Sequence, residues 1–416
     1  MTTHERVVIV GAGQAGVGLA DALREQGFDG PVTIIGGEGH LPYERPPLSK
    51  AFLNLAPFDE FGLSLRTTQW YKDHGVELVL GRTVEQIDRA ARTVETDVGE
   101  LIGYDHLVLA TGTRARVLPL QGTDLDGVLG LRDLDEARTL RRHLDGASSL
   151  LAIGAGFIGL EVAAAAHKRG VHTTVVDVAP RVMERAVTPT TSAYFAEAHR
   201  VWGTNLLLGS SVTTLRGRDG RVGGAITADG DEIPADLVVI AIGVQPNVEL
   251  AEKAGLEVSN GIVVDSHLRT SDPAISAIGD CAWFPEPISG SGARLESVQA
   301  AADHARCVAA RLVGRPAPYA AVPWFWTHQG DLKLQIAGLG TGVDTEIVRG
   351  DPRTRRFSVF GYRSGALATV ESINRPADHV AARRLLAAKA SPAPEDVADP
   401  EFNLKAYAAG AGMAAT

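Results

Sequence analysis

The sequence is poor in cysteine. Cys281 and Cys307 are the two cysteines among 416 residues, and no Cys-x-x-Cys or Cys-x₄-Cys pair occurs. A disulfide framework and a cysteine-ligated iron–sulfur cluster are therefore not expected. We predict no metal centre in this chain, and any cluster that takes part in its reaction would belong to a partner protein.

Long apolar runs are also missing. No stretch of 18 apolar residues occurs, so no transmembrane helix is expected. The first strand begins by about Arg6, which leaves no room for a signal peptide. Hydrophobic residues make up 45% and charged residues 22%, as in an ordinary globular protein. We expect a cytoplasmic location.

Basic residues are fewer than acidic ones, 40 against 50, and the net charge of −10 argues against non-specific nucleic-acid binding. The charge is uneven, however. From Arg294 onward there are 15 Lys and Arg against 12 Asp and Glu, whereas the preceding part has 25 against 38. Chance could produce this difference, and so could a docking face for an acidic partner, since complementary fields steer encounter.

Glycine, in contrast, is abundant, with 46 residues. An apolar run at 7–10 leads into Gly-x-Gly-x-x-Gly at Gly11, Gly13 and Gly16, and a helical pattern follows. These glycines allow a tight turn and let backbone N–H groups at a helix N-terminus approach a pyrophosphate. Glu38, 22 residues after Gly16, is the candidate for hydrogen bonding an adenosine ribose, with a solvated turn glutamate as the alternative.

The same pattern returns 143 residues later. Gly154, Gly156 and Gly159 follow another apolar run, and Asp177 lies 18 residues after the last glycine. A later strand and turn at 105–112 also recurs, at 236–243. Two such fingerprints with acids at matching distances predict two dinucleotide sites.

The order of these patterns predicts an α/β fold with two Rossmann-like dinucleotide-binding domains. Beyond Pro323 the sequence pattern changes. Short segments with alternating apolar and polar residues predict strands at 332–337, 357–360 and 367–372, and a helix is predicted at 376–390, which indicates a small α+β C-terminal domain. The predicted domains are 1–112 with 246–322, then 113–245, then 323–416.

The segment Leu41–Lys50 is unusual. Pro46 and Pro47 fix an extended approach, and Ser49 is expected to cap a helix that begins near Lys50. A lysine in the first turn of a helix is disfavoured by the helix dipole. We therefore predict that Lys50 faces a ligand.

At this point the residues resemble a known family, the oxygenase-coupled NADH-dependent ferredoxin reductases of the putidaredoxin reductase and biphenyl dioxygenase reductase type. The resemblance covers nearly the whole chain. It rests on the motifs at 11–16, 45–50, 110–112, 154–161, 270–273, 279–282, 296–298, 324–326 and 374–376. The Arg-Pro-Pro-Leu-Ser-Lys and Trp-Phe-Trp motifs are the most specific of these.

The resemblance implies a glutathione-reductase-like architecture in which the first fold binds FAD and the second binds NADH. It implies that Lys50 and Glu161 form a catalytic pair near the nicotinamide–flavin stack. Trp326 would lie beside the isoalloxazine, and a purely structural aromatic cluster is the alternative. The FAD-binding residues that follow are Gly11, Gly13, Ala15, Gly16, Glu38, Arg45, Lys50, Val84, Thr111, Gly112, Arg132, Gly279, Asp280, Val298 and Trp326. The NADH-binding residues are Gly154, Gly156, Ile158, Gly159, Glu161, Asp177, Arg185, Ile242 and Gly243.

Two positions refine these assignments. The family often has an acidic residue where this chain has Gly37, so ribose binding is expected to shift to Glu38. Asp177 would accept a hydrogen bond from a free 2′-hydroxyl and repel a 2′-phosphate, which predicts NADH over NADPH. Arg185 is the counter-argument, because it could pair with a phosphate, although the resemblance places it at the adenosine end.

Cysteine also separates the relatives of this architecture. Disulfide reductases have a redox-active pair in the region where this chain has Pro42–Lys50, and here there is none. Electrons should therefore leave the flavin for an outside acceptor, a [2Fe–2S] ferredoxin that serves a cytochrome P450 or a ring-hydroxylating oxygenase. Arg66, Arg306 and Lys333 are candidates for a transient, electrostatically steered docking face. His304, like His328, is expected to be structural.

Two alternatives stay open. One is an NADH:rubredoxin or quinone-type reductase with the same site and another acceptor. The other is an apoptosis-inducing-factor-like flavoprotein that senses NADH through assembly.

Overall fold

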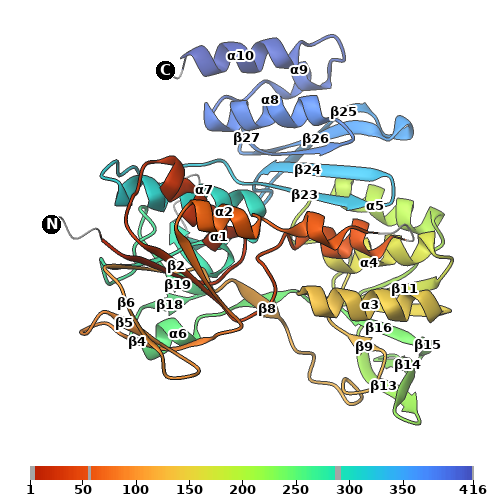
Figure 1. Ribbon diagram of the computed structural model, residues 1–416. Helices are drawn as coiled ribbons and strands as arrows, with labels where there is room; N and C mark the ends of the chain where they lie inside the picture. The colour runs from red at the N-terminus through yellow and green to blue at the C-terminus, as the bar shows by residue number, and fades with distance from the viewer. Residues whose placement is uncertain (1–4, 55–57, 286–291, 415–416) are drawn as a thin grey trace. The chain divides into compact units, whose positions relative to one another are not determined.

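The computed structural model describes residues 5–54, 58–285 and 292–414 (Figure 1). The chain divides into two compact units. The first contains Met1–Glu44, Asp59–Arg114 and Gln245–Ala321, and the second contains Arg45–Phe58, Ala115–Val244 and Val322–Thr416. The chain passes from one unit to the other five times, and two of these crossings run through the short strands β8 (Thr113–Ala115) and β17 (Val244–Pro246).

The first unit is built on a five-stranded parallel sheet in the order β20-β7-β1-β2-β3. All four residues of β1 are buried, as expected of a central parallel strand covered on both faces. The strands are β1 (Val7–Val10), β2 (Val32–Gly36), β3 (Val76–Leu80), β7 (His106–Leu109) and β20 (Ile275–Ala277).

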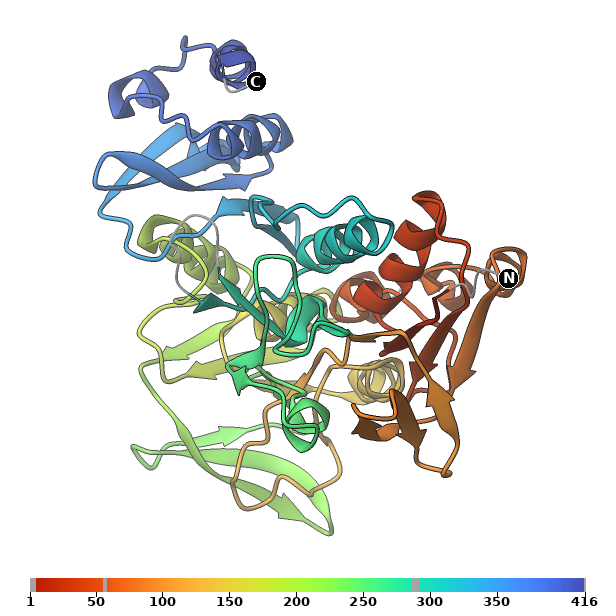
Figure 2. The ribbon, with the colours of Figure 1, turned by 90° about the vertical axis from the view of Figure 1, so that its left-hand side faces the viewer.

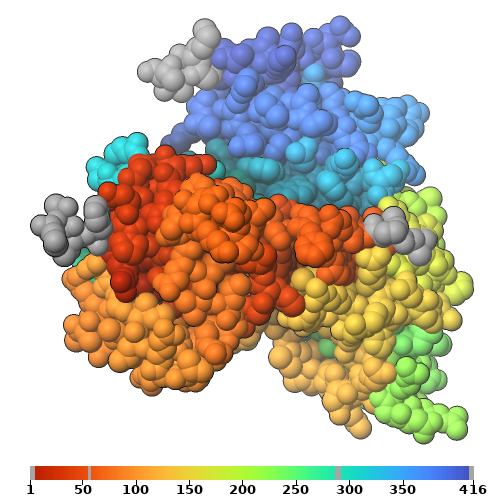
Figure 3. Space-filling model, viewed as in Figure 1, coloured from red at the N-terminus to blue at the C-terminus, as the bar shows by residue number. Residues whose placement is uncertain are grey.

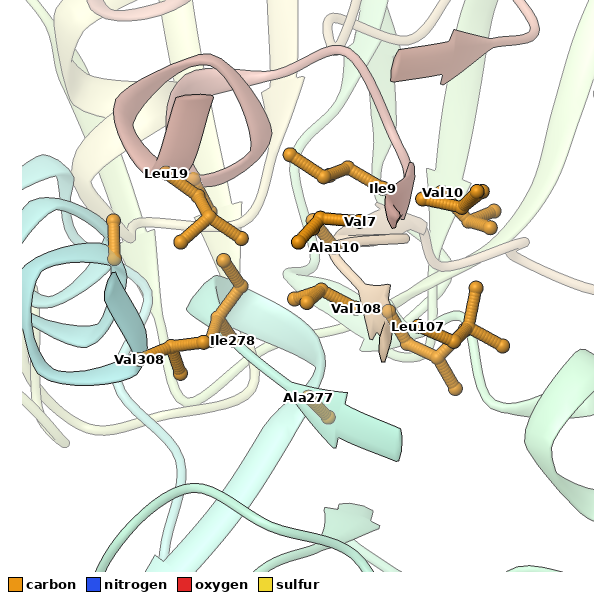
Figure 4. Packing of buried hydrophobic residues seen from close by; sticks show 14 of the residues in the cluster. Val7, Ile9, Val10, Leu19, Leu107, Val108, Ala110, Ala277, Ile278 and Val308 are labelled. Atoms are coloured by element: carbon orange, nitrogen blue, oxygen red, sulfur yellow. The ribbon is translucent and has the colours of Figure 1, made fainter. Parts of the chain in front are cut away.

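Two helices cover this sheet, α1 (Gln14–Glu25) and α7 (Val298–Leu312). Figure 4 shows Leu19 of α1 and Val308 of α7 pointing toward Ile278, next to the strand residues of the same apolar core. Ser297 caps α7, because its side chain accepts a hydrogen bond from the backbone N–H of Ala300.

Smaller elements complete the first unit. They are the sheet β4 (Val84–Asp88), β5 (Thr93–Thr96) and β6 (Leu101–Gly103), the sheet β18 (Val258–Ser259), β19 (Gly261–Val263), β21 (Ala282–Pro285) and β22 (Gly292–Ala293), the helices α2 (Thr68–Asp73) and α6 (Glu249–Lys253), and the 3₁₀ turns η3 (Glu60–Leu63) and η4 (Gly279–Cys281).

The second unit repeats the parallel sheet in the order β12-β11-β10-β16-β9. Its outermost strand, β9, comes from upstream in the chain, whereas the matching strand of the first sheet, β20, comes from downstream. The elements are β9 (Val128–Leu129), α3 (Leu134–Gly146), β10 (Ser149–Ile153), α4 (Phe157–Lys168), β11 (His172–Asp177), α5 (Pro189–Val201), β12 (Asn205–Leu208) and β16 (Leu237–Ile240), with a side sheet of β13 (Val212–Arg218), β14 (Arg221–Thr227) and β15 (Glu232–Pro234).

The C-terminal part of the second unit is an antiparallel sheet in the order β23-β24-β27-β26-β25. Helix α8 lies across one face of this sheet, and α10 packs on α8 (Figures 1 and 2). The elements are β23 (Trp324–Gln329), β24 (Leu332–Gly338), β25 (Thr345–Asp351), η5 (Pro352–Thr354), β26 (Arg356–Arg363), β27 (Ala366–Ile373), α8 (Pro376–Ala387), α9 (Pro394–Ala398) and α10 (Leu404–Ala414).

The proline-rich segment differs from its prediction. Instead of a helix capped by Ser49, it forms two 3₁₀ turns, η1 (Pro46–Ser49) and η2 (Ala51–Leu53), on either side of Lys50. The capping prediction is wrong because the Ser49 hydroxyl donates to the carboxylate of Glu161 instead, and neither turn has a side-chain cap hydrogen bond. Side chains that follow or belong to α4 and α3 also hold the segment. Arg169 donates to the carbonyl of Leu53, and Arg141 lies over the ring of Phe52. In Figure 3 this orange segment lies against yellow residues of the same unit.

The predicted α/β fold with two dinucleotide-binding folds and a C-terminal α+β part is confirmed. The three predicted domain boundaries stay a prediction. Within the described ranges, none of the helices combines the length and apolar character needed to cross a membrane.

Candidate active site

The first glycine loop joins β1 to α1 in the first unit. A Cβ on Gly16 would lie 2.0 Å from the carbonyl oxygen of Gly11, so this turn has room for hydrogen alone. Gly13, the N-cap of α1, is different, because no described atom lies within 4 Å of the place where its Cβ would stand. No side chain caps α1, and its first turn has no acidic residue. The loop therefore offers an open face and uncapped N–H groups, the features that bind a pyrophosphate.

The second loop, between β10 and α4 in the second unit, repeats this geometry. A Cβ on Gly159 would lie 2.0 Å from the carbonyl oxygen of Gly154, while the Cβ position of Gly156 has no described atom within 4 Å. Helix α4 likewise has no side-chain cap and no acidic residue in its first turn. The residues present thus fit one dinucleotide at each loop.

Asp177 ends β11 beside the second loop. Its carboxylate accepts hydrogen bonds from the backbone N–H of Ala155 (2.6 Å) and of Ala179 (2.8 Å). These bonds fix the carboxylate next to the glycine loop, where the ribose of a bound dinucleotide is expected.

Four other residues expected at this site lie close to it or on its elements. Ile158 is 38% exposed in the first turn of α4. Arg185 has a guanidinium nitrogen 3.6 Å from where a Cβ on Gly243 would stand. Gly243 and Ile242 follow the end of β16, the neighbour of β10 in the sheet.

In the first unit, the turn that contains Asp280 lies beside the first glycine loop. A Cβ on Gly279 would come within 2.8 Å of the Cβ of Ala15. The hydroxyl of Thr113 donates to the carboxylate of Asp280 at 3.4 Å. The predicted FAD residues of both segments are therefore neighbours.

The turn at Thr111 and Gly112 is held by Asn247, which the sequence did not single out. The Thr111 hydroxyl donates to the carbonyl of Asn247 (2.7 Å), and the Asn247 amide donates to the carbonyl of Thr111 (2.8 Å). Glu38 accepts a hydrogen bond from the hydroxyl of Tyr43. This contact makes Glu38 part of a local structure rather than a freely solvated turn residue.

His304 is buried behind the Asp280 turn. Its Nδ1 accepts the backbone N–H of Gly279 at 3.1 Å, and its ring packs edge-on against Phe284 and Tyr319. Burial lowers the pKa of His304 to about 3, so the ring is neutral. The geometry gives it a structural role, as expected, and that role is to hold the loop on which Asp280 stands.

Val84 and Val298 begin β4 and α7 of the first unit, respectively. Four further residues of the predicted FAD set belong to the second unit: Arg45, Lys50, Arg132 and Trp326. Within that unit, the guanidinium of Arg45 donates to the carbonyl of Arg132 at 2.8 Å. Trp326 is half-buried on β23, with its ring 5.4 Å from that of Trp324.

The expected pairing of Lys50 with Glu161 is present. The Lys50 ammonium lies 2.9 Å from Oε2 of Glu161, and it also donates to the carbonyl of Pro46 at 3.1 Å. The Glu161 side chain is only 1% exposed, and that of Lys50 is 17% exposed. Such a buried carboxylate requires partners that compensate its lost hydration.

Two hydroxyls complete the environment of Glu161. Ser49 donates to Oε2, and Thr327 donates to Oε1 at 2.6 Å. Sequence reasoning missed Thr327 and assigned Ser49 to a helix cap. The available signal was that Thr327 and Gln329 place polar side chains two residues apart on the buried face of β23.

His328, the other histidine considered above, is exposed on β23. Partial loss of hydration, followed by the charges of Lys333 and Lys50, lowers the pKa of His328. The structural role expected for His328 stays a prediction.

Comparisons with known proteins agree with this geometry. Residues 5–305 match the family described as pyridine nucleotide-disulphide oxidoreductase, and residues 324–408 match the family described as reductase C-terminal. Over 399 residues the chain is 50% identical to rhodocoxin reductase of Rhodococcus erythropolis. This aligned region covers 96% of this chain and 93% of that protein.

Two solved structures are similar over almost their entire lengths. The ferredoxin reductase for the CYP199A2 system from Rhodopseudomonas palustris has a TM-score of 0.95 at 47% identity, covering 97% of this chain and 100% of that one. The reductase of the covalent putidaredoxin reductase–putidaredoxin complex has a TM-score of 0.95 at 38% identity, covering 99% of both chains.

Fold and site together define a flavoprotein oxidoreductase that uses FAD and a nicotinamide dinucleotide. Within that class, the chain belongs to the family of oxygenase-coupled ferredoxin reductases, the family that its sequence resembles.

Proposed function

We propose that this protein transfers electrons from NADH through FAD to a [2Fe–2S] ferredoxin that serves a cytochrome P450 or a ring-hydroxylating oxygenase. The observation that carries the proposal is the pair of matched, open glycine loops in one chain that has no cysteine between Pro42 and Lys50. Two loops provide for two dinucleotides. The missing cysteines leave no internal disulfide to receive the electrons, so they pass to a partner.

The loop at Gly11–Gly16, with Asp280 beside it, is assigned to FAD, and the loop at Gly154–Gly159, with Asp177, to NADH. FAD, when bound, supplies the chemistry that accepts a hydride and releases electrons singly, while the protein binds and orients it. Glu161 and Lys50 are assigned to the reacting end of the nicotinamide. Their pairing keeps a positive and a negative charge in a fixed arrangement from which water is largely excluded.

Asp177 is expected to determine the choice of nicotinamide. Because its carboxylate would repel a 2′-phosphate, Asp177→Ala should lower the NADH/NADPH ratio of kcat/KM by about tenfold, comparable to one charge-assisted hydrogen bond. Asp177→Asn, which keeps the shape without the charge, is the matched variant and should shift the ratio in the same direction. Steady-state kinetics with both nucleotides measure this, and an unchanged ratio in both variants would refute the assignment.

The partner class is tested by NADH-dependent reduction of cytochrome c in the presence of a panel of acceptors. We expect rapid turnover when a [2Fe–2S] ferredoxin is added, and slow turnover with rubredoxin, with a quinone or with no carrier. Rapid turnover with rubredoxin alone would favour the rubredoxin reductase alternative. If the protein reduces no carrier but changes its assembly with NADH, the sensing alternative would replace the proposal.

The same assay tests electrostatic steering. Ferredoxin-dependent turnover should fall steeply as ionic strength rises, because salt screens exposed charges over about 10 Å at 0.1 M. Two of the candidate docking cations already have local partners, since Arg66 pairs with Asp21 and Arg306 with Asp303. Lys333 is exposed on β24. A flat salt dependence would count against a steered complex.

A further inference from the structure

A chain of buried polar side chains extends from Glu161 through the interior of the second unit. Thr327 donates to Oε1 of Glu161, and the amide nitrogen of Gln329 lies 3.4 Å from the Thr327 hydroxyl. The amide oxygen of Gln329 is 3.0 Å from Nε2 of His199, and Nδ1 of His199 is 3.5 Å from the hydroxyl of Thr204. All five side chains belong to buried residues.

The chain has one internally consistent direction. Gln329 uses its nitrogen toward Thr327, so its oxygen must accept from His199 Nε2–H. Nδ1 of the neutral ring is then left to accept from Thr204. Every link therefore donates toward Glu161, and hydrogen bonds aligned in this way polarise and strengthen one another.

A neutral His199 is required for this direction. Burial, the largest effect, lowers the pKa of His199 to about 4, although the hydrogen bond to Gln329 opposes the shift. A protonated ring would carry a proton on Nδ1 and could not accept from Thr204.

We infer that Thr327 is a positioning residue for the Lys50–Glu161 pair, and that Gln329 and His199 support it from behind. Oε2 of Glu161 already receives Ser49 and Lys50, so the hydroxyl of Thr327 fixes the other oxygen and with it the plane of the carboxylate. This inference rests on the proposed function of the pair in flavin reduction.

Stopped-flow reduction of bound FAD by NADH tests the inference in the holoenzyme. Thr327→Val should lower the limiting rate constant about tenfold, the loss of roughly one charge-assisted hydrogen bond, at an unchanged dissociation constant for NADH. Thr327→Ser keeps the hydroxyl and should restore the rate to within about twofold. The matched control is Thr369→Val, which changes an equally buried threonine of the same sheet whose hydroxyl donates to the carbonyl of Ala337.

The variant Gln329→Met tests whether Gln329 influences flavin reduction through its hydrogen bond to Thr327. If Gln329 acts through Thr327, its effect should disappear in the Thr327→Val background, so that the double variant is no slower than Thr327→Val alone. If the two substitutions lower the rate constant independently, so that their effects multiply in the double variant, the inference is overturned. It is also overturned if Thr327→Val reduces its flavin as fast as the Thr369→Val control.

Two measurements separate this inference from the proposed function. Crystal structures of the wild type and of Thr327→Val should show the Glu161 carboxylate rotated in the variant, and an unmoved carboxylate would refute positioning. Nitrogen-15 NMR of labelled histidines should show His199 as the Nε2–H tautomer at pH 7, and the Nδ1–H tautomer would reverse the donor direction and refute the chain. If Glu161→Gln reduces its flavin at the wild-type rate, the proposed function of the pair fails, while these two measurements still decide the positioning inference.

Discussion

Replacing Lys50 with methionine is expected to slow the reduction of bound FAD by NADH about 100-fold, the loss typical of removing one preorganised electrostatic group from a reaction site. The ammonium is the cation that faces the Glu161 carboxylate at 2.9 Å, in a place where that carboxylate is 1% exposed. Stopped-flow absorbance of the flavin measures the rate directly. Lys50→Arg keeps the charge in a different shape and should recover part of the rate.

The same substitution has a second, separable effect on stability. Removing one partner of a buried ion pair leaves an uncompensated charge, which costs about 3–5 kcal/mol. The double variant Lys50→Met, Glu161→Gln should therefore regain stability against urea relative to Lys50→Met, because the buried charge is gone. Its flavin reduction should stay slow. If Lys50→Met is unstable but reduces flavin at the wild-type rate, the lysine has a structural role and the assigned role is wrong.

Alanine at the middle glycine of each loop should separate the two dinucleotide sites. Gly13 and Gly156 have extended backbone angles, with φ of −87° and −78°, that any residue adopts, and a Cβ at either place meets no described atom. The fold should accept both changes at a cost below about 1 kcal/mol. A bound pyrophosphate, however, would meet the added methyl group.

Gly13→Ala should therefore weaken FAD binding by a factor on the order of 100, equivalent to one or two charge-assisted hydrogen bonds, in a protein with a near-normal melting temperature. Gly156→Ala should keep its FAD and raise the dissociation constant for NADH by a similar factor. Each variant is the control for the other. The flavin spectrum and NADH titrations provide the readouts, and the opposite pattern would exchange the two site assignments.

The parts of the fold that depend on local chemistry could be predicted from the sequence. Four consecutive apolar residues, Val7–Val10, indicate a strand that is buried on both faces of its sheet. The spacing of the glycines that follow then determines the tight turn and the start of α1. The duplication of that pattern at Gly154 indicated the second sheet. The C-terminal strands also followed from their alternation, although α8 ends at Ala387, three residues before the predicted end.

What failed depended on partners distant in sequence. Ser49 has the composition of a helix cap, yet its hydroxyl binds a carboxylate 112 residues away. Thr327 is 166 residues from the same carboxylate, so nothing near it in the sequence indicates the contact. The partner of Asn247, Thr111, is also distant in sequence. Tyr43 is close to Glu38 in sequence, but their contact depends on the conformation of the turn between them. Side-chain polarity on a buried strand face showed that a partner was required, but only tertiary structure shows which one.

The central claim is that two electrons enter from NADH and leave singly to a ferredoxin. An anaerobic titration tests it most directly, with known amounts of NADH added to the FAD-loaded protein and an excess of oxidised [2Fe–2S] ferredoxin. We predict two ferredoxins reduced for each NADH consumed, with the flavin oxidised again at the end. A flavin that stays reduced beside oxidised ferredoxin would contradict the account.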